Sequence, residues 1–165
     1  LNSDGSRGDL IKINGGYRMP SSPETLREKV VDEYGNIRSE EQGYMQGADV
    51  FNFVIREIPR DIKRLAEWSG EDLQGLDYYV FHQANNFINT YLAKKLRLDA
   101  ERIPSTIAKF GNTSSVSVPL TIASELKGRM EGDRKLLLSA FGVGMTWGTA
   151  VVPFRDLRIS DLVEV

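Results

Sequence analysis

A short apolar run between two helical patterns limits most strongly what this chain can fold into. Residues 76–81 are mostly apolar, which suits a strand that is buried on both faces. Residues 48–68 carry apolar side chains at steps of three and four, the period of an amphipathic helix, which Pro59 should bend or divide in two. A second helix should begin at Asn85 and end with cations near residue 97. Helix, strand and helix in this order indicate an α/β domain.

The remaining segments are consistent with that class. Strands are predicted over residues 10–13, 134–141 and 149–154, and a glycine-rich turn over 142–148 should pair the last two. A further helix is predicted over residues 115–127, with Pro119 near its first turn, where proline is tolerated. We therefore expect helices layered on a mixed β-sheet.

Two segments near the start of the chain are predicted to contain less regular structure. Residues 2–6 indicate a turn that is entered from an earlier strand. Residues 20–47 are polar and rich in turn formers, so we expect a long excursion with at most a short helix over 25–31. This excursion could form part of a pocket rim.

Composition excludes several classes of function. The 165 residues, 41% hydrophobic and 27% charged, fit one ordinary soluble domain. A net charge of -2, from 21 basic and 23 acidic residues, gives no basic field for nucleic-acid binding. With no cysteine, the chain has no disulfide, thiolate metal site or thiol nucleophile. No apolar run approaches the length of a membrane span, so we expect no membrane association and a cytoplasmic location.

His82 is the only histidine and follows a predicted strand. Sheets of α/β domains usually bind their ligands at this edge, so the position favours a functional role. The alternative is a histidine that makes only local hydrogen bonds. A zinc site is rejected, because the chain has no second histidine and no cysteine to complete a tetrahedral ligand set.

Two loops offer hydrogen-bond donors. Asn112 follows Gly111 and precedes a predicted helix, so it could cap that helix. Its amide could also join an imidazole N–H in stabilising negative charge on a carbonyl oxygen, and both roles can coexist. Residues 142–148 lead into a strand rather than a helix, which excludes a dinucleotide loop. We favour a tight hairpin there over backbone N–H groups directed at an oxyanion.

Cations at the end of the second predicted helix allow two interpretations. Lys94 and Lys95, together with Arg97, could form a solvated face or bind an acidic partner. A serine hydrolase has little support, because the Gly-x-Ser-x-Gly pattern is absent and no acidic residue is obviously placed against His82.

Three motifs resemble one known family. Residues 82–85 (HQAN), 111–115 (GNTSS) and 140–148 (AFGVGMTWG) resemble the C-terminal half of β-ketoacyl-acyl-carrier-protein synthase III. Smaller similarities at residues 3–6 and 45–51 extend the resemblance over nearly the whole chain.

The resemblance implies a thiolase-like fold, of which residues 1–165 would be a single domain, the C-terminal half. The nucleophilic cysteine of the family lies on the N-terminal half, so this chain alone should be inactive. The family takes an acyl group from coenzyme A and condenses it with malonyl-acyl-carrier protein after decarboxylation, which starts fatty acid synthesis. The implied substrates are therefore acyl-CoA and malonyl-acyl-carrier protein, the implied partners are the carrier protein and a second copy in a homodimer, and no cofactor is permanently bound.

The resemblance also assigns roles to individual residues. His82 and Asn112 would stabilise the malonyl thioester oxygen, and the backbone N–H of Val143 would belong to an oxyanion hole. Contacts to coenzyme A would fall on Gly47, Phe51, Ala84, Asn85 and Phe141, with Asn112 at the end of the tunnel. Docking of the carrier protein would fall on Lys94 and Lys95.

Two departures from the family pattern weaken the assignment of carrier-protein docking. Phe87 stands where the family often has arginine, and Asn52 stands where it often has lysine. The long segment 17–43 hints at a different acyl primer or a specialised pathway. The alternatives are therefore a condensing enzyme of secondary metabolism and a non-catalytic scaffold, although retention of both His82 and Asn112 argues against the scaffold.

Overall fold

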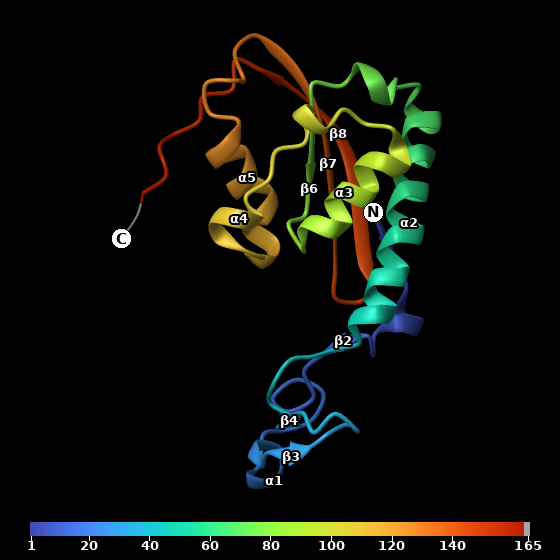
Figure 1. Cartoon of the computed structure of the whole chain (residues 1–165), viewed down its shortest axis with the longest axis vertical. Coiled ribbons are helices and arrows are strands. Elements are labelled where there is room, and N and C mark those ends of the chain that lie inside the picture. The colour runs from blue at the N-terminus through green and yellow to red at the C-terminus, as the bar shows by residue number, and fades with distance from the viewer. Residues whose placement is uncertain (164–165) are drawn as a thin grey trace.

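A four-stranded mixed sheet forms the centre of the molecule, whose computed structural model describes residues 1–163 (Figure 1). The strand order is β1-β8-β7-β6, with β6 parallel to β7 and the other pairs antiparallel. The strands of this sheet are β1 (Asn2–Ser3), β6 (Tyr78–Phe81), β7 (Asp133–Gly142) and β8 (Thr146–Arg155). The predicted α/β class with a mixed sheet is confirmed.

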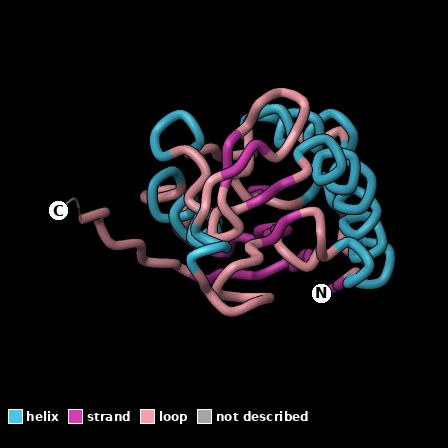
Figure 2. Tube along the Cα trace, turned by 90° about the horizontal axis from the view of Figure 1, so that it is seen from below, coloured by secondary structure: helices cyan, strands magenta, loops and turns pink. Residues whose placement is uncertain are grey.

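Helices cover both faces of the sheet, as the view from below shows (Figure 2). The helices are α1 (Pro23–Leu26), α2 (Gly47–Ser69), α3 (Asn86–Leu96), α4 (Ile107–Phe110) and α5 (Ser117–Glu125). One-turn 3-10 helices lie at η1 (Gly5–Arg7), η2 (Leu73–Gly75), η3 (Ala100–Arg102) and η4 (Ser114–Val116). None of the helices within residues 1–163 is long and apolar enough to cross a membrane.

Strand β6 is buried on both faces, as its sequence predicts. Tyr79 and Phe81 belong to the core cluster under α2 and α3, whereas Val80 belongs to a second cluster beside α5. Successive side chains of a strand point to opposite faces, so this alternation is expected of a central strand. The two clusters fix α2 and α3 on one side of the sheet and α5 on the other.

Pro59 was predicted to bend the helix or divide it in two, and the division is wrong, because α2 is one continuous element. Ile58 and Ile62 beside Pro59 are almost completely buried, and Pro59 itself is buried. Proline inside a helix costs about 3 kcal/mol, which packing of an amphipathic face can offset. The helix ends at Gly70, whose φ of 72° is the left-handed conformation that glycine adopts readily.

Helix α3 and the closing hairpin agree with prediction. Asn85 is the N-cap residue of α3, and its side chain accepts a hydrogen bond from the backbone N–H of Ile88. Strands β7 and β8 pair along their full lengths, and the connection between them, residues 143–145, is shorter than expected.

The region before α5 differs from prediction. Helix α5 spans Ser117–Glu125 instead of residues 115–127, because residues 114–116 form the 3-10 turn η4 and the chain turns again after Glu125. Pro119 is the third residue of α5, where its missing N–H removes no intrahelical bond. Helix α4 has only four residues and was not expected from the sequence.

Residues 13–43 form a separate projection below the sheet, here called the arm (Figure 1). Its stem is the pair β2 (Ile11–Lys12) and β5 (Tyr44–Met45), and within it β3 (Lys29–Val30) pairs with β4 (Ile37–Arg38). The strand predicted at residues 10–13 is present but shorter, since it spans only Ile11–Lys12. The helix expected over 25–31 lies instead at Pro23–Leu26, where Ser22 caps it and proline begins it.

Candidate functional site

One pocket gathers the main candidate residues at an edge of the sheet. It measures about 790 Å³, and His82, Asn112, Phe141 and Val143 line it. His82 follows β6 and Phe141 lies near the end of β7, and these strands are parallel. The carboxyl ends of parallel strands meet at one edge, where open α/β sheets bind ligands. The fold therefore brings together residues that are up to 61 positions apart in the sequence.

His82 is held from three directions. Its backbone N–H donates to the carbonyl of Ser139 at 2.9 Å, and its Nδ1 lies 2.7 Å from the hydroxyl oxygen of Ser117. The edge of the imidazole meets the ring of Phe141, with 5.1 Å between centroids and 83° between planes. Burial lowers the pKa of His82 below its usual 6.5, so the ring is neutral at pH 7.

Asn112 is held by its own turn. Its side-chain oxygen accepts a hydrogen bond from the backbone N–H of Ser114 at 2.9 Å, which leaves the amide NH₂ as a donor. Gly111 and Ser114 have φ values of 66° and 55°, so the segment that carries Asn112 is tightly bent. The predicted cap on the following helix is wrong, because the N-cap residue of α5 is Val116 and Asn112 bonds inside η4 instead.

Val143 lies at the tip of the β7–β8 hairpin and is 63% exposed. The hairpin predicted for residues 142–148 is confirmed, and no helix follows it. Val143 contributes to the pocket lining together with its neighbour Gly142.

A second group of candidates lies outside the pocket lining. Gly47 and Phe51 are in the first turns of α2, while Ala84 and Asn85 precede α3, and these two helices pack together. Phe51 and Ala84 pack against the core, and the ring of Phe51 lies 5.5 Å from that of the exposed Phe87.

The polar stretch predicted as a rim contributes little to the pocket. Of residues 20–47, only Met45 lines it, beside Ile11 from the paired strand β2. The arm beyond this stem extends away from the sheet (Figure 1).

Lys94 and Lys95 are exposed in the last turn of α3. At 1.5 Å per residue, Lys94 lies about 12 Å along the helix from Asn86. Neither lysine forms an ion pair with residues 1–163. The structure therefore separates these lysines from the pocket and leaves them open to solvent.

Ser117 is a site residue that the sequence did not single out. It is 1% exposed, lines the pocket and contacts His82. The sequence offers three similar serines after Asn112, at positions 114, 115 and 117. Only the start of α5 at Ser117 distinguishes the one that reaches the imidazole.

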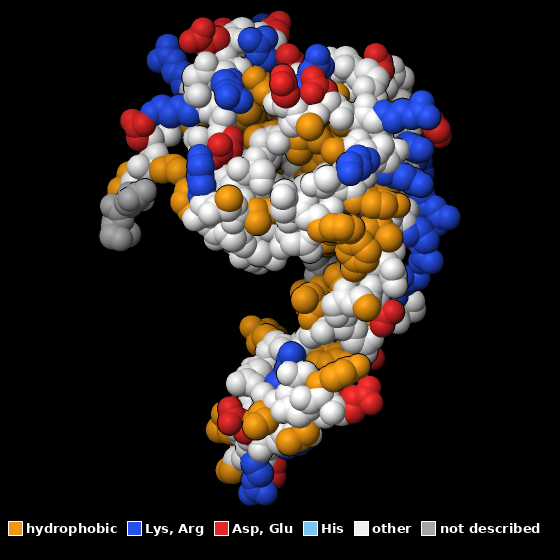
Figure 3. All heavy atoms as spheres, viewed as in Figure 1, with side chains coloured by type: hydrophobic (Ala, Val, Ile, Leu, Met, Phe, Trp, Pro, Cys, Tyr) orange, Lys and Arg blue, Asp and Glu red, His pale blue; other side chains and the backbone are white. Residues whose placement is uncertain are grey.

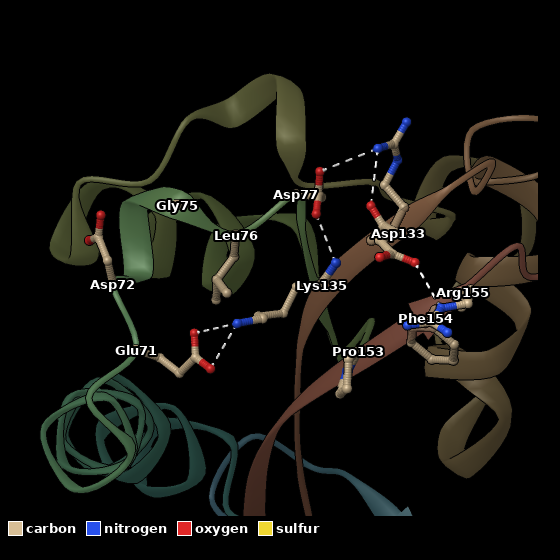
Figure 4. Close-up of a pocket in the computed structure, with 11 residues that line it drawn as sticks. Glu71, Asp72, Gly75, Leu76, Asp77, Asp133, Lys135, Pro153, Phe154 and Arg155 are labelled. Carbon is tan, nitrogen blue, oxygen red and sulfur yellow. Dashed lines mark hydrogen bonds and ion pairs between the residues drawn. The ribbon is translucent and has the colours of Figure 1, made fainter.

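A second hollow, of about 730 Å³, lies at the opposite end of β6 and β7 (Figure 4). Its charged side chains face one another: Lys135 contacts both carboxylate oxygens of Glu71 at 2.9 Å, and Asp133 pairs with Arg155. Mutual pairing leaves these groups little charge for a ligand. Within residues 1–163, no cluster of three or more histidine and acidic side chains could hold a metal ion.

Comparison with known proteins identifies the same family that the motifs lining the pocket resemble. Residues 66–154, more than half of the chain, match the family described as "3-Oxoacyl-[acyl-carrier-protein (ACP)] synthase III C terminal". The chain is 35% identical over 155 residues to the beta-ketoacyl-[acyl-carrier-protein] synthase III of Streptococcus mutans, and 34% identical over 154 residues to that of Streptococcus gordonii. These matches cover 92% and 91% of this chain, but only 45% and 44% of the two relatives.

A solved structure gives the same result. The crystal structure of a 3-oxoacyl-(acyl-carrier protein) synthase from Burkholderia xenovorans matches with a TM-score of 0.85 and 34% identity. It aligns with 99% of this chain and with 46% of its own chain, so the fold is thiolase-like and spans about half the length of these relatives. This chain belongs to the 3-oxoacyl-[acyl-carrier-protein] synthase III family and corresponds to its C-terminal region.

Proposed function

We propose that residues 1–165 are a single domain, the C-terminal half of a β-ketoacyl-acyl-carrier-protein synthase III. In this proposal His82 and Asn112 stabilise the thioester oxygen of malonyl-acyl-carrier protein. The supporting observation is that both residues line one pocket while each has one side-chain atom already engaged by the protein. Each can therefore direct its other polar atom at a substrate.

Decarboxylation of the malonyl group can be assisted by uncharged hydrogen-bond donors such as those proposed for His82 and Asn112. When the malonyl group loses CO₂, the electrons of the broken C–C bond move into the thioester and place negative charge on its carbonyl oxygen. Two fixed hydrogen-bond donors in a water-poor pocket stabilise this enolate more than bulk water does. The pocket lining contains no acidic side chain to repel that charge.

The second step joins the two substrates. The enolate carbon attacks the carbonyl of an acyl group held as a thioester on cysteine, and the resulting oxyanion collapses as the cysteine sulfur leaves. The backbone N–H of Val143 is proposed as an oxyanion donor, because it lies at the exposed hairpin tip beside His82 and Asn112.

The cysteine must come from another part of the protein, since this chain contains none. We propose that an N-terminal half supplies it, that the complete protein is a cytoplasmic homodimer, and that this chain alone is inactive. Acyl-CoA and malonyl-acyl-carrier protein are the proposed substrates, and no permanently bound cofactor is required by the chemistry above.

The approach to the pocket is proposed to bind coenzyme A. Gly47 and Phe51 lie at the start of α2, and Ala84 and Asn85 lie just before α3, which packs against α2 and approaches it through the Phe51–Phe87 ring pair. Phe141 lies in the pocket against the ring of His82. Aromatic and small side chains suit a flexible thioester arm, because they offer apolar contact and close backbone approach.

Docking of the carrier protein is proposed for Lys94 and Lys95. Both are exposed, and an acidic protein would be attracted to them at low salt. Exchanging both for glutamate in the complete protein should raise KM for malonyl-acyl-carrier protein, and salt should weaken the difference. KM for acyl-CoA should change less, because coenzyme A is proposed to bind at the other end of α3.

The decisive experiment separates decarboxylation from acyl transfer in the complete protein. We expect His82→Ala and Asn112→Ala each to lower CO₂ release from malonyl-acyl-carrier protein about a hundredfold to a thousandfold. Acylation of the cysteine by acyl-CoA, followed by intact mass, should continue in both variants. Condensation at the unmodified rate in either variant would reject the assigned role.

A further inference from the structure

The hydroxyl of Ser117 occupies a buried position between two partners. Its oxygen lies 2.7 Å from Nδ1 of His82 and accepts the backbone N–H of Gln83 at 3.3 Å. Ser117 is 1% exposed and Gln83 is completely buried, so solvent has little access to these bonds.

Counting donors and acceptors decides the direction of the bond to His82. If Nδ1 carried the proton, two N–H groups would point at the hydroxyl oxygen, and the buried hydroxyl proton would have no acceptor within residues 1–163. If the hydroxyl donates to Nδ1, the serine oxygen accepts from Gln83 and all of these groups are satisfied. A neutral imidazole that accepts at Nδ1 carries its proton on Nε2.

We propose that Ser117 is a positioning residue that holds His82 as the Nε2–H tautomer, with this donor available to the pocket. Nε2 makes no hydrogen bond within residues 1–163, although His82 lines the pocket. The catalytic consequence rests on the proposed function, because an enolate oxygen requires a donor from His82. The assignment of the tautomer itself does not depend on that function.

A buried hydrogen-bond network holds Ser117 in place. Thr121 donates to the carbonyl of Ser117 at 2.8 Å, and its hydroxyl lies 2.9 Å from that of Thr106. The backbone N–H of Thr106 donates to the side-chain oxygen of Gln83 at 3.0 Å, which closes the network on the residue next to His82. Satisfied buried networks fix one geometry, so His82 is oriented by three separate segments of the chain.

The surroundings of His82 favour its neutral form. The side chains that line the pocket include no aspartate, glutamate, lysine or arginine, so among them only the imidazole of His82 titrates near neutral pH. Burial lowers the pKa of His82. A hydroxyl that donates to Nδ1 acts in the same direction, because the protonated ring has no lone pair to accept it.

The single histidine makes the proposal directly measurable. In the protein labelled with ¹⁵N-histidine, one pair of ring nitrogens gives the tautomer from two-bond ¹H–¹⁵N correlation spectra at pH 7. We expect a protonated Nε2 and an unprotonated Nδ1. A ring protonated on Nδ1, or on both nitrogens, would overturn the proposal without any variant.

Two variants test the role of the hydroxyl. Ser117→Ala should shift the tautomer ratio about fivefold toward Nδ1–H, the effect of one hydrogen bond, and should raise the pKa of His82. Ser124→Ala, which removes a hydroxyl of the same helix that bonds Glu125, should leave both quantities unchanged. Unchanged ring shifts in folded Ser117→Ala would overturn the proposal, whereas loss of the proposed function would appear separately, as normal condensation by the complete His82→Ala protein.

Discussion

The sheet with its covering helices and the arm are stabilised by different interactions. The sheet and its helices enclose two apolar clusters that include Phe53, Ile58 and Leu137. In the arm, residues 13–43, only Gly15 and Thr25 are buried, and each strand has two residues. Apolar burial dominates stability where it is available, so the two regions should respond differently to substitution and to pH.

Two carboxylates organise the arm in place of a core. Glu40 accepts from the side-chain amide of Asn14 at 2.6 Å and pairs with Lys29 at 2.9 Å. Glu41 accepts from the hydroxyl of Thr25 at 2.6 Å. The backbone joins this arrangement, since the N–H of Glu40 donates to the carbonyl of Thr25 at 3.0 Å. The arm is therefore an arrangement of charge-assisted hydrogen bonds.

The arm also exposes many apolar side chains, some of which are visible as hydrophobic atoms on its surface in Figure 3. They are Ile13, Tyr17, Met19, Leu26, Val30, Val31, Tyr34 and Ile37. Their exposure means that removing one costs little burial in this chain, in contrast to a core residue of the sheet.

The largest expected difference follows from truncating one side chain in each region. Phe53 is 1% exposed and packs edge-on against Trp147 with 5.0 Å between centroids. Phe53→Ala should lower the free energy of unfolding by about 3–5 kcal/mol, because it removes buried area and leaves a cavity. Ile37→Ala, at a side chain that is 61% exposed, should change it by less than about 0.5 kcal/mol. Urea unfolding followed by circular dichroism measures both, and equal losses would contradict the comparison.

A backbone substitution near the site should have an intermediate effect. Gly111 has φ 66° and ψ -153°, a conformation that is essentially restricted to glycine, and no atom lies within 4 Å of an added Cβ. Gly111→Ala should therefore destabilise by about 1–3 kcal/mol through backbone strain alone. The same variant should displace Asn112, so in the complete protein decarboxylation should fall more than acyl transfer. Unchanged stability and activity would show that the turn relaxes without cost.

Replacing Asn89, in the well-packed helix α3, should raise the free energy of unfolding. It is buried on α3, and neither its side-chain oxygen nor its nitrogen has a hydrogen-bond partner in the described chain. Asn89→Leu should raise the free energy of unfolding by about 1 kcal/mol, since it removes two buried polar atoms that lack partners. Thermal unfolding measures the change, with the exposed Asn86→Leu on the same helix as the control. A fall in stability would mean that the amide is satisfied by a buried water.

Much of the sheet and its helices could be predicted from the sequence because local pattern and packing agree there. The period of α2, the apolar run of β6 and the cap at Asn85 were each visible in the chain. The arm could not be predicted in the same way, because its short strands have neither periodicity nor a buried face. The helix is not divided at Pro59, because the cost of this proline is offset by contacts from distant residues, which the local sequence pattern does not contain.

The same distinction applies to the pocket. The sequence placed His82 at the end of a strand, and the parallel pairing of β6 and β7 brings it to the hairpin. Ser117 was missed because its role depends on where α5 begins relative to His82, 35 residues away. The sequence alone does not show which of the three serines faces His82. The packing of α5 beside β6 places the hydroxyl of Ser117 against the imidazole.

Acid should loosen the arm through Glu40. Its hydrogen bond from Asn14, and then its bond and ion pair with Lys29, hold its pKa below the usual 4.5. Its stabilising contribution is present above pH 4.5 and is lost as the pH falls through the lowered pKa, because the open arm binds the proton first. From about pH 6 to about pH 3, exchange of the Gly15 and Glu40 amides, corrected for intrinsic rates, should therefore accelerate relative to that of β7.

The pH response of the sheet and its helices has a different origin. Burial lowers the pKa of His82, so the stability linked to its neutral form is present above pH 6.5 and is lost as the pH falls below that value. Glu40→Gln should remove the acceleration at the Gly15 amide below pH 4.5 and leave the His82-linked loss unchanged. If Glu40→Gln abolished both responses, the arm and the sheet would open as one cooperative unit, and the difference in their packing would not divide the molecule energetically.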